Sequence, residues 1–368
     1  MISKGEEMRA LEEEDVAEGK TERFEDEVAR HQVMVGIDLG TCRTVVMSDK
    51  GDKLLIRSVV GYPKDIISRQ MVGEGPLFGA EALEKRNFLD LCFPLAEGVV
   101  REASERDYRA ARELVRHVVD LVRNGTDVEV CGIIGVPARA SVMNKELLLK
   151  VAREMMTKTL VVSEPFMVAY ALTRLNKCIV IDIGAGTVDI CCMKGSVPAP
   201  EDQVTTFKGG DYIDERLEAA IARRYPGVQV TKSVACAIKE EHAFVGEPEQ
   251  PVEVTLRAEG KPARFDVTRE IRTVCESIVP DILEQVETLI TSFDPEDQED
   301  ALKNIILAGG GSRIRGLDRM IADRLQEYGE VQVTCVDNPE YVGAIGALKL
   351  AKEVPPAHWA QIGLMFGG

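Results

Sequence analysis

Residues 178–190 of this 368-residue chain read CIVIDIGAGTVDI, and this stretch decides the fold. An apolar run leads into Asp182, a glycine-rich turn follows, and the apolar run resumes at Val188. The pattern predicts a buried strand, a tight turn and a second strand, which together form a β-hairpin. Residues 35–45 read VGIDLGTCRTV and repeat the pattern, with Asp38 in the place of Asp182, 144 residues earlier. The repeat predicts two homologous lobes, each opening with a hairpin.

Alternating strand and helix patterns follow each hairpin, so the predicted fold class is α/β. Apolar runs predict strands, and a 3.6-residue apolar period predicts helices. We expect strands at residues 128–136, 160–162, 252–266 and 304–307, and helices at residues 104–123, 144–156, 163–175, 211–224, 233–245 and 267–293. Glycines and a proline between residues 73 and 79 predict loops in a smaller irregular region.

Composition excludes several classes of protein. The hydrophobic fraction of 45% and the charged fraction of 29% are those of a globular chain, and the formal net charge is −17. A chain this acidic repels phosphate backbones, so we expect no nucleic-acid partner. No run of ~20 apolar residues predicts a membrane span, and the N-terminus lacks the pattern of a secretory signal. Nine dispersed cysteines without a CxxC pair predict reduced thiols rather than a disulfide framework or a zinc site.

Residues 1–30 differ from the rest of the chain. They hold eleven acids against five bases, including the acidic run at residues 12–15, and few large apolar residues. This composition predicts a solvated extension rather than part of a core. A tether or a partner-binding arm is the functional alternative for the same segment.

Three glycine-rich turns are candidates for binding phosphate. Residues 38–44 and 182–189 are hairpin turns, where backbone N–H groups can face phosphate oxygens and an aspartate at the strand end can hold Mg²⁺. The first turn alone is equally typical of an ordinary Asx turn, whereas the same device on two homologous lobes favours a shared polyphosphate. Residues 308–312 place three glycines between a strand and a helical segment. Neither a Rossmann fingerprint nor a P-loop is present.

Glu164 follows the strand at residues 160–162, with Pro165 in the first turn of the next helix. A glutamate at this position can face a ligand between the lobes. It can equally stabilise the N-terminus of its own helix, and the sequence alone does not separate the two roles.

Taken in order, these motifs resemble the superfamily of actins, heat-shock chaperones and sugar kinases over roughly residues 33–352. The length and the Glu164-Pro165 pair resemble bacterial actins. Further stretches resemble the magnetosome-associated bacterial actins, namely residues 58–65, 134–141, 162–168, 200–204 and 310–317. The acidic residues 1–30 depart from that pattern.

The resemblance implies an actin-like fold, in which two duplicated RNase H-like lobes with smaller inserted subdomains surround a nucleotide cleft. It places the first lobe at residues 31–177 plus 338–368, with an insertion at about 53–98 and the C-terminal tail packed on it. It places the second lobe at residues 178–337, with a small subdomain at about 210–268.

The resemblance also implies the site. Glu164 and Asp182 are the expected catalytic residues, and Asp38 and Asp182 the expected Mg²⁺ ligands through water. The expected nucleotide-binding residues are Gly40, Thr41, Cys42, Arg43, Gly184, Ala185, Gly186, Thr187, Gly209, Gly210, Asp211, Lys239, Glu240, Gly309, Gly310, Gly311 and Ser312.

The function implied by the resemblance is a filament-forming ATPase of the bacterial cytoskeleton, which polymerises with ATP, disassembles after hydrolysis to ADP, and positions or segregates magnetosome organelles. Its expected partners are further copies of itself, head to tail, and magnetosome adaptor proteins, without nucleic acid or direct membrane insertion. The expected location is the cytoplasm, alongside magnetosome chains. A small-molecule kinase of the same superfamily fold is the alternative.

Overall fold

The computed structural model describes residues 32–96, 98–101, 104–355 and 359. Its first sheet has five strands in the order β10-β9-β1-β2-β3. These strands are β1 (Gln32–Leu39), β2 (Arg43–Ser48), β3 (Lys53–Arg57), β9 (Glu129–Val136) and β10 (Lys158–Ser163). β1, β2 and β3 form an antiparallel meander, and β9 pairs in parallel with both β1 and β10. The central parallel strand β9 is almost continuously apolar and buried, because helices cover both faces of the sheet.

The second sheet repeats this topology in the order β13-β12-β11-β17-β18. Its strands are β11 (Asn176–Ile183), β12 (Val188–Lys194), β13 (Gln203–Thr206), β17 (Ile305–Ala308) and β18 (Val333–Cys335). The first three are again an antiparallel meander, and β17 pairs in parallel with β11 and with β18. The duplication predicted from the two hairpins is therefore confirmed at the level of strand order and direction.

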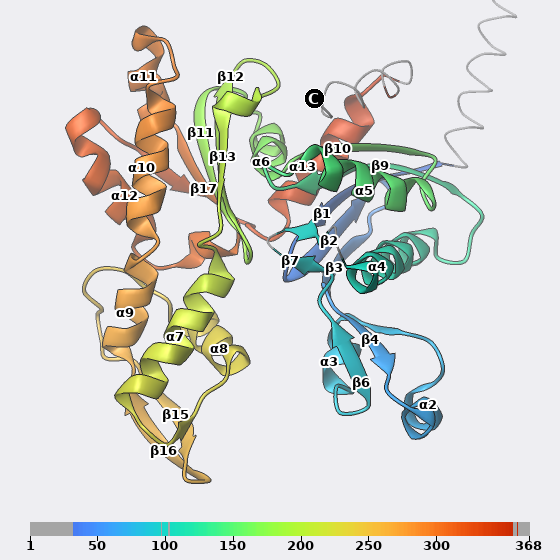
Figure 1. Ribbon diagram of the computed structural model, residues 1–368. Coiled ribbons are helices and arrows are strands. Elements are labelled where there is room, and N and C mark those ends of the chain that lie inside the picture. Colours follow the sequence, from blue (N-terminus) through green and yellow to red (C-terminus); the bar gives the residue numbers. More distant parts are fainter. Residues whose placement is uncertain (1–31, 97, 102–103, 356–358, 360–368) are drawn as a thin grey trace, which may run out of the picture.

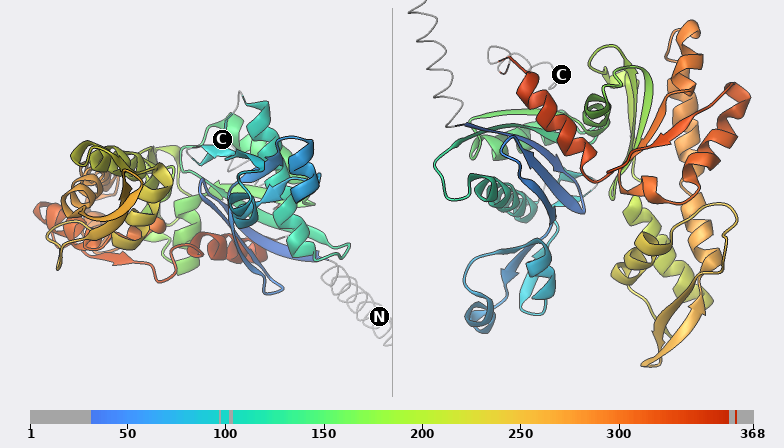
Figure 2. Two further views of the ribbon diagram at one scale, coloured as in Figure 1. Left: turned by 90° about the horizontal axis from the view of Figure 1, so that it is seen from below. Right: turned by 180° about the vertical axis from the view of Figure 1, so that it is seen from behind.

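Helices cover both sheets (Figures 1 and 2). The first sheet packs with α4 (Glu105–Arg123), α5 (Val142–Arg153) and α13 (Val342–Glu353), and the second with α10 (Val279–Ile290), α11 (Pro295–Leu302) and α12 (Leu317–Leu325). Helix α6 (Glu164–Leu172) packs against both sheets. We call each sheet with its helices a lobe. The chain leaves the second lobe after β18, and α13 then packs against β1 and α6. A β-carbon at Gly346 would lie 1.9 Å from the Met167 carbonyl oxygen, so only glycine allows α13 to approach α6 this closely.

Each lobe carries a smaller subdomain, and both lie at the lower end of the molecule in Figure 1. The first holds β4 (Val60–Pro63), α2 (Ile66–Val72), β5 (Leu77–Phe78), α3 (Gly79–Glu84) and β6 (Leu89–Cys92), followed by the small hairpin of β7 (Leu95–Ala96) and β8 (Val99–Val100). Because β3 belongs to the main sheet, this insertion begins at Val60 rather than near residue 53. The second holds α7 (Gly210–Arg224), β14 (Val228–Gln229), α8 (Lys232–His242), β15 (Glu253–Ala258) and β16 (Lys261–Asp266).

Two local predictions were wrong. The helix predicted at residues 267–293 is two helices, α9 (Thr268–Glu276) and α10, because Pro280 has no N–H for a continuous helix and lies in the first turn of α10. The strand predicted at residues 252–266 is a hairpin that turns at Glu259 and Gly260, both with positive φ. The loop predicted from glycines and a proline at residues 73–79 is confirmed for residues 73–76, which connect α2 to β5, and Gly79 begins α3.

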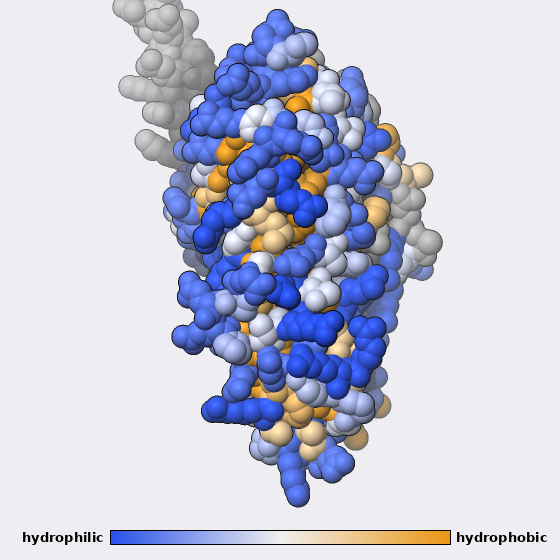
Figure 3. Space-filling model, turned by 90° about the vertical axis from the view of Figure 1, so that its left-hand side faces the viewer, coloured by the Kyte–Doolittle hydropathy of each residue, from blue (hydrophilic) through white to orange (hydrophobic). Residues whose placement is uncertain are grey.

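A shared apolar cluster joins the lobes. It includes Ile133 and Val162 of the first sheet, Val180 and Ile306 of the second, and Ala347 of α13. Trp359, a residue of the predicted C-terminal tail, is buried in this cluster. The tail beyond residue 359 and the acidic extension at residues 1–30 lie outside the described residues. The outer face of the second lobe is predominantly hydrophilic (Figure 3). Within the described part of the chain, no helix has the length and apolar character needed to span a membrane.

Candidate functional site

A cleft of about 410 Å³ opens between the lobes, and residues from both line it. It collects most of the residues predicted for the site, including the three candidate catalytic and metal-binding carboxylates, Asp38, Glu164 and Asp182. The other predicted residues in its lining are Gly40, Thr41, Cys42, Arg43, Gly184, Ala185, Gly186, Thr187, Gly210, Asp211, Lys239, Glu240, Gly309, Gly310 and Gly311. Gly209 and Ser312 do not line it. The structure therefore brings together segments that lie more than 250 residues apart in the sequence.

The two hairpin turns have the same backbone closure. The Gly40 N–H donates to the Arg43 carbonyl at 3.1 Å, and the Gly184 N–H donates to the Thr187 carbonyl at 2.9 Å. Helix α7 then begins against the second turn, because the Gly210 N–H donates to the Gly184 carbonyl at 2.9 Å. Only glycine fits at position 209 beside this junction, since a β-carbon there would lie 2.7 Å from the Ala185 carbonyl oxygen.

The turn after β17 approaches the end of β11 closely. Gly309 has φ of 72° and ψ of 172°, a region essentially restricted to glycine. A β-carbon there would lie 2.3 Å from Asp182 Oδ1 and 2.4 Å from the Ile183 carbonyl oxygen. Ser312 is buried, and its hydroxyl donates to the Gly309 carbonyl at 2.7 Å. Ser312 thus holds the turn, whereas Gly310 and Gly311 present backbone to the cleft.

Three carboxylates lie together at the base of the cleft. Burial raises the pKa of Asp38 to about 6. Burial also raises the pKa of Asp182 well above its usual value, and the charges of Asp38 and Asp189 raise it further. For Glu164, burial is again the main cause of a strongly raised pKa, followed by repulsion from Asp38, Asp189 and Asp182. Glu164 Oε1 is buried and has no hydrogen-bond partner among the described residues. Such a cluster of repelling carboxylates favours a bound cation.

Asp38 and Asp182 fit a hydrated Mg²⁺ ion. Among the described residues, no group of three His, Cys, Asp or Glu side chains is arranged to hold a metal by itself. Mg²⁺ commonly binds proteins through one or two carboxylates and completes its shell with water and substrate phosphates. The pair lies near the ends of the equivalent strands β1 and β11, and Gly343 leaves room for Asp38, since a β-carbon there would lie 2.7 Å from Asp38 Oδ2. The donor set is therefore that of a water-held ion rather than a closed metal cage.

Asp189 forms a direct link between the lobes. Its Oδ1 accepts hydrogen bonds from the Ala138 N–H at 2.7 Å and from the Thr205 hydroxyl at 2.6 Å. Arg139, which follows Ala138 in the first lobe, also contacts the second lobe. Its backbone N–H donates to Thr205 Oγ1, and its guanidinium donates to the Pro200 carbonyl. Asp189 is thus a fixed point between the lobes, close enough to the cleft to affect the pKa values of its carboxylates.

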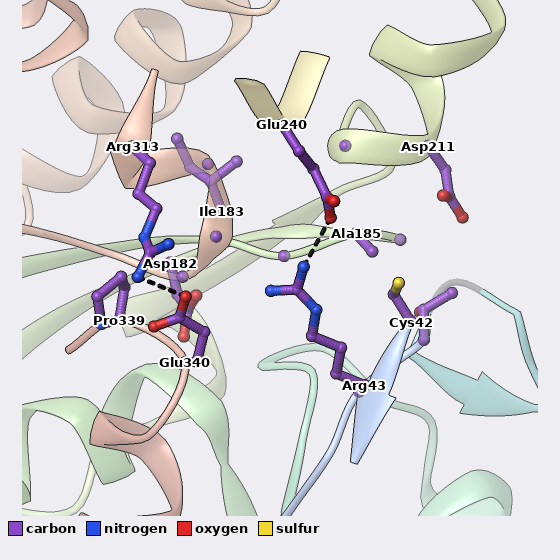
Figure 4. Close-up of a pocket in the computed structure, with 18 of the residues that line it drawn as sticks. Cys42, Arg43, Asp182, Ile183, Ala185, Asp211, Glu240, Arg313, Pro339 and Glu340 are labelled. Atoms are coloured by element: carbon purple, nitrogen blue, oxygen red, sulfur yellow. Dashed lines mark hydrogen bonds and ion pairs between the residues drawn. The ribbon is translucent and has the colours of Figure 1, made fainter. Parts of the chain in front are cut away.

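Three residues predicted to bind the nucleotide, Arg43, Lys239 and Glu240, have partners within the protein. Arg43, at the start of β2, extends across the cleft to Glu240 of α8, with an N–O distance of 2.6 Å (Figure 4). Lys239 Nζ lies 2.7 Å from buried Asp214 and donates to the Gly210 carbonyl at 2.9 Å. Lys239 therefore fixes α8 to the start of α7, and the Arg43–Glu240 pair bridges the lobes.

Sequence reasoning missed several residues that line the cleft. Arg313 pairs with Glu340 at 2.5 Å, on the side of the cleft formed by β17 and the segment before α13 (Figure 4). Gly343, Cys236 and Gly98 also line it. No local motif marks these positions, because each reaches the cleft only through the packing of distant elements.

Comparison with known proteins identifies the family. The model of the MreB/Mbl protein family matches residues 32–357. The chain belongs to the MreB/Mbl family. It is 51% identical to the actin-like protein MamK of Paramagnetospirillum magneticum over 92% of this chain and 98% of that protein. The MamK of Magnetospirillum gryphiswaldense is also 51% identical, over 92% of this chain and 94% of the relative.

Solved structures give the same family. A subunit titled "MamK double helical filament" superimposes with a TM-score of 0.86 at 52% identity, covering 88% of this chain and all of that one. A non-polymerising point mutant of MamK bound to AMPPNP gives 0.70 at 51% identity, covering 88% of this chain and 99% of that one. The actin-like fold expected from the resemblance is confirmed. The present structure superimposes better on the filament subunit than on the AMPPNP-bound mutant, by TM-score.

Proposed function

We propose that this member of the MreB/Mbl family is an actin-like ATPase that assembles head to tail into filaments with ATP and disassembles after hydrolysis. The observation that carries the proposal is the pair of equivalent glycine turns, one from each lobe, that line a single cleft with Asp38, Asp182 and Glu164 at its base. The solved structures of MamK, 51–52% identical to this chain, include a double helical filament and a non-polymerising mutant bound to AMPPNP, which supports the same role here.

The roles of the residues follow from their chemistry. The turns at residues 40–43 and 184–187 would donate backbone N–H groups to the β- and γ-phosphates, and Gly309, Gly310 and Gly311 would approach the rest of the nucleotide. Gly209 and Ser312 would support those turns rather than contact the nucleotide. Phosphoryl hydrolysis depends mainly on positioning and charge neutralisation.

Glu164 is the candidate for orienting or deprotonating the attacking water. Its free, buried Oε1 is available to accept a hydrogen bond from that water. Mg²⁺, held through water by Asp38 and Asp182, would neutralise phosphate charge and reduce the repulsion that, together with burial, raises the pKa of Glu164. In its ionised form Glu164 accepts the proton.

Assembly follows from the shared nucleotide. A ligand that contacts both lobes biases their closure by its differential affinity for the two arrangements. Head-to-tail contacts between closed subunits are heterologous and generate open filaments. We further propose a cytoplasmic filament alongside magnetosome chains, joined to them by adaptor proteins, and the resemblance to MamK supports this location.

A small-molecule kinase of the same superfamily is not favoured, because the relatives that match most of the chain are actin-like proteins. Sedimentation with Mg-ATP separates the two functions. ATP-dependent pelleting, with filaments seen by electron microscopy, is the expected result. Phosphate transfer to a small molecule without pelleting would refute the proposal.

Replacing Glu164 by Gln tests the chemistry separately from assembly. The variant keeps the size of the side chain and loses its capacity to take a proton, so we expect normal ATP-dependent pelleting with phosphate release reduced roughly 10²-fold or more. Glu146→Gln, an exposed change on α5, is the matched control and keeps full turnover. Undiminished phosphate release by the Glu164 variant would exclude it as the group that activates water.

A further inference from the structure

A second groove, outside the nucleotide cleft, lies between α7 and α9 of the second lobe. Its volume is about 510 Å³. Arg216, Arg223 and Arg224 line it from α7, and Arg269 lines it from α9. Tyr212, Arg216, Ala220 and Arg223 follow one another at intervals of three or four residues, so they share the face of α7 along the groove. Tyr212 adds an aromatic wall, with the Arg216 guanidinium 5.1 Å from the centre of its ring.

Most of this positive charge is uncompensated. Arg224 is neutralised by the buried Glu270, at an N–O distance of 2.6 Å. Arg216, Arg223 and Arg269 are exposed and form no ion pair with any residue that the structure describes. Three exposed guanidinium groups that lack an ion-pair partner among the described residues line one groove, which is unexpected in a chain of net charge −17. Guanidinium groups bind carboxylates with paired hydrogen bonds, so the groove is suited to an acidic peptide.

The chain itself contains a segment of the complementary charge. Residues 1–30 carry eleven acids against five bases, with four consecutive acids at residues 12–15. This segment precedes the region matched by the family model, which begins at residue 32. It joins the fold at β1, in the first lobe. Thirty-one residues span up to about 100 Å when extended, which is enough to reach the second lobe of the same subunit or of a neighbouring one.

We propose that residues 1–30 form an acidic arm that binds the arginine groove between α7 and α9. The arm's carboxylates would pair with Arg216, Arg223 and Arg269, which have no other charged partner among the described residues. Because the arm starts in the first lobe and the groove lies on the second, the bound arm ties two lobes together, either within a subunit or between subunits. The contact does not involve the nucleotide cleft, and the proposal is independent of ATP hydrolysis.

A binding assay tests this with the full-length chain. Its own arm is neutralised by replacing Glu12, Glu13 and Glu14 with Gln and Asp15 with Asn, so that it does not compete. A fluorescent synthetic peptide of residues 1–30 is then titrated with this protein and followed by anisotropy. We expect binding that weakens with added salt, because salt screens exposed charge pairs. A peptide carrying the same four neutral substitutions should lose the binding.

Two triple variants of that protein locate the contact. Replacing Arg216, Arg223 and Arg269 with Gln should weaken binding roughly tenfold or more, as expected for the loss of several exposed charge-assisted pairs. The control replaces the exposed arginines Arg153, Arg174 and Arg324 with Gln, which removes the same charge elsewhere and should leave the affinity within about twofold. Equal weakening by both variants, or no binding at millimolar protein, would overturn the proposal. Thermal unfolding of each variant checks that the fold is intact.

Hydrogen exchange provides a second readout on the unlabelled protein. Amides of α7 and α9 should exchange more slowly in the natural chain than in the chain with the neutralised arm, because the bound arm covers the groove. The dependence of this protection on protein concentration distinguishes an arm bound within one subunit from one bound to a neighbour. Identical exchange in the two proteins would count against the proposed contact.

Discussion

Replacing Gly309 by alanine tests whether the close approach of β17 to β11 forms the base of the cleft. The backbone at Gly309 has φ of 72° and ψ of 172°, which alanine adopts at a cost of about 1–3 kcal/mol. The added methyl group also meets the Ile183 carbonyl oxygen at 2.4 Å and its carbon at 2.7 Å. These atoms belong to β11, so they cannot move without disturbing the pairing of Ile183 with Val188.

Overpacking of this kind costs a further 1–3 kcal/mol or so. The two terms together predict a loss of roughly 2–6 kcal/mol in the free energy of unfolding of the second lobe. For a unit of 150–250 residues this corresponds to a fall in the unfolding temperature of at least about 4 °C. Asp182 Oδ1 lies 2.3 Å from the same methyl position, so its side chain must rotate away. Mg²⁺-dependent nucleotide binding should therefore weaken as well.

Gly310→Ala is the matched control, one residue further along. A β-carbon there meets no heavy atom within 4 Å, and its φ is not positive. Differential scanning calorimetry should find the unfolding temperature of this variant close to that of the natural protein. Equal unfolding temperatures for the two variants would refute the packing argument.

Three further predictions concern charge. Burial raises the pKa of Asp38 to about 6, so lowering the pH from 7.5 to 5.5 protonates this carboxyl and should weaken Mg²⁺-dependent nucleotide binding. A Mg²⁺ titration at both pH values checks this, and an unchanged nucleotide affinity would contradict the assignment of Asp38 to the metal. Arg43→Gln removes the partly exposed ion pair with Glu240 that bridges the cleft. Such a pair is worth about 0.2–1 kcal/mol, so release of a fluorescent nucleotide should become about two- to fivefold faster. Slower or unchanged release in a stopped-flow measurement would show that the pair does not hold the lobes together. Because subunits of net charge −17 repel one another, pelleted filament should increase from low to moderate ionic strength, whereas a flat or falling yield would count against electrostatic control of assembly.

Much of the site was predictable because its parts are local. A buried strand, an aspartate and a glycine turn are contiguous in the sequence, and the repeat of this unit predicted two equivalent sheets. The errors occurred where contiguous patterns were ambiguous. A mainly helical period from residue 267 to 293 does not reveal that Pro280 begins a new helix. The support roles of Gly209 and Ser312 depend on neighbours that only folding supplies, so both were assigned to the nucleotide itself.

The sequence by itself determined the duplicated α/β fold and the residue types around the cleft, because strand period, glycine turns and proline positions act over a few residues. Only the tertiary structure decided which charges meet. Burial and the distances between elements far apart in the chain raise the pKa values of Asp182 and Glu164 and bring Arg43 to Glu240. They also leave arginines between α7 and α9 without an ion-pair partner among the described residues. Electrostatic energies depend on the distances between charged groups and on the removal of water from around them, and the order of residues in the sequence specifies neither directly.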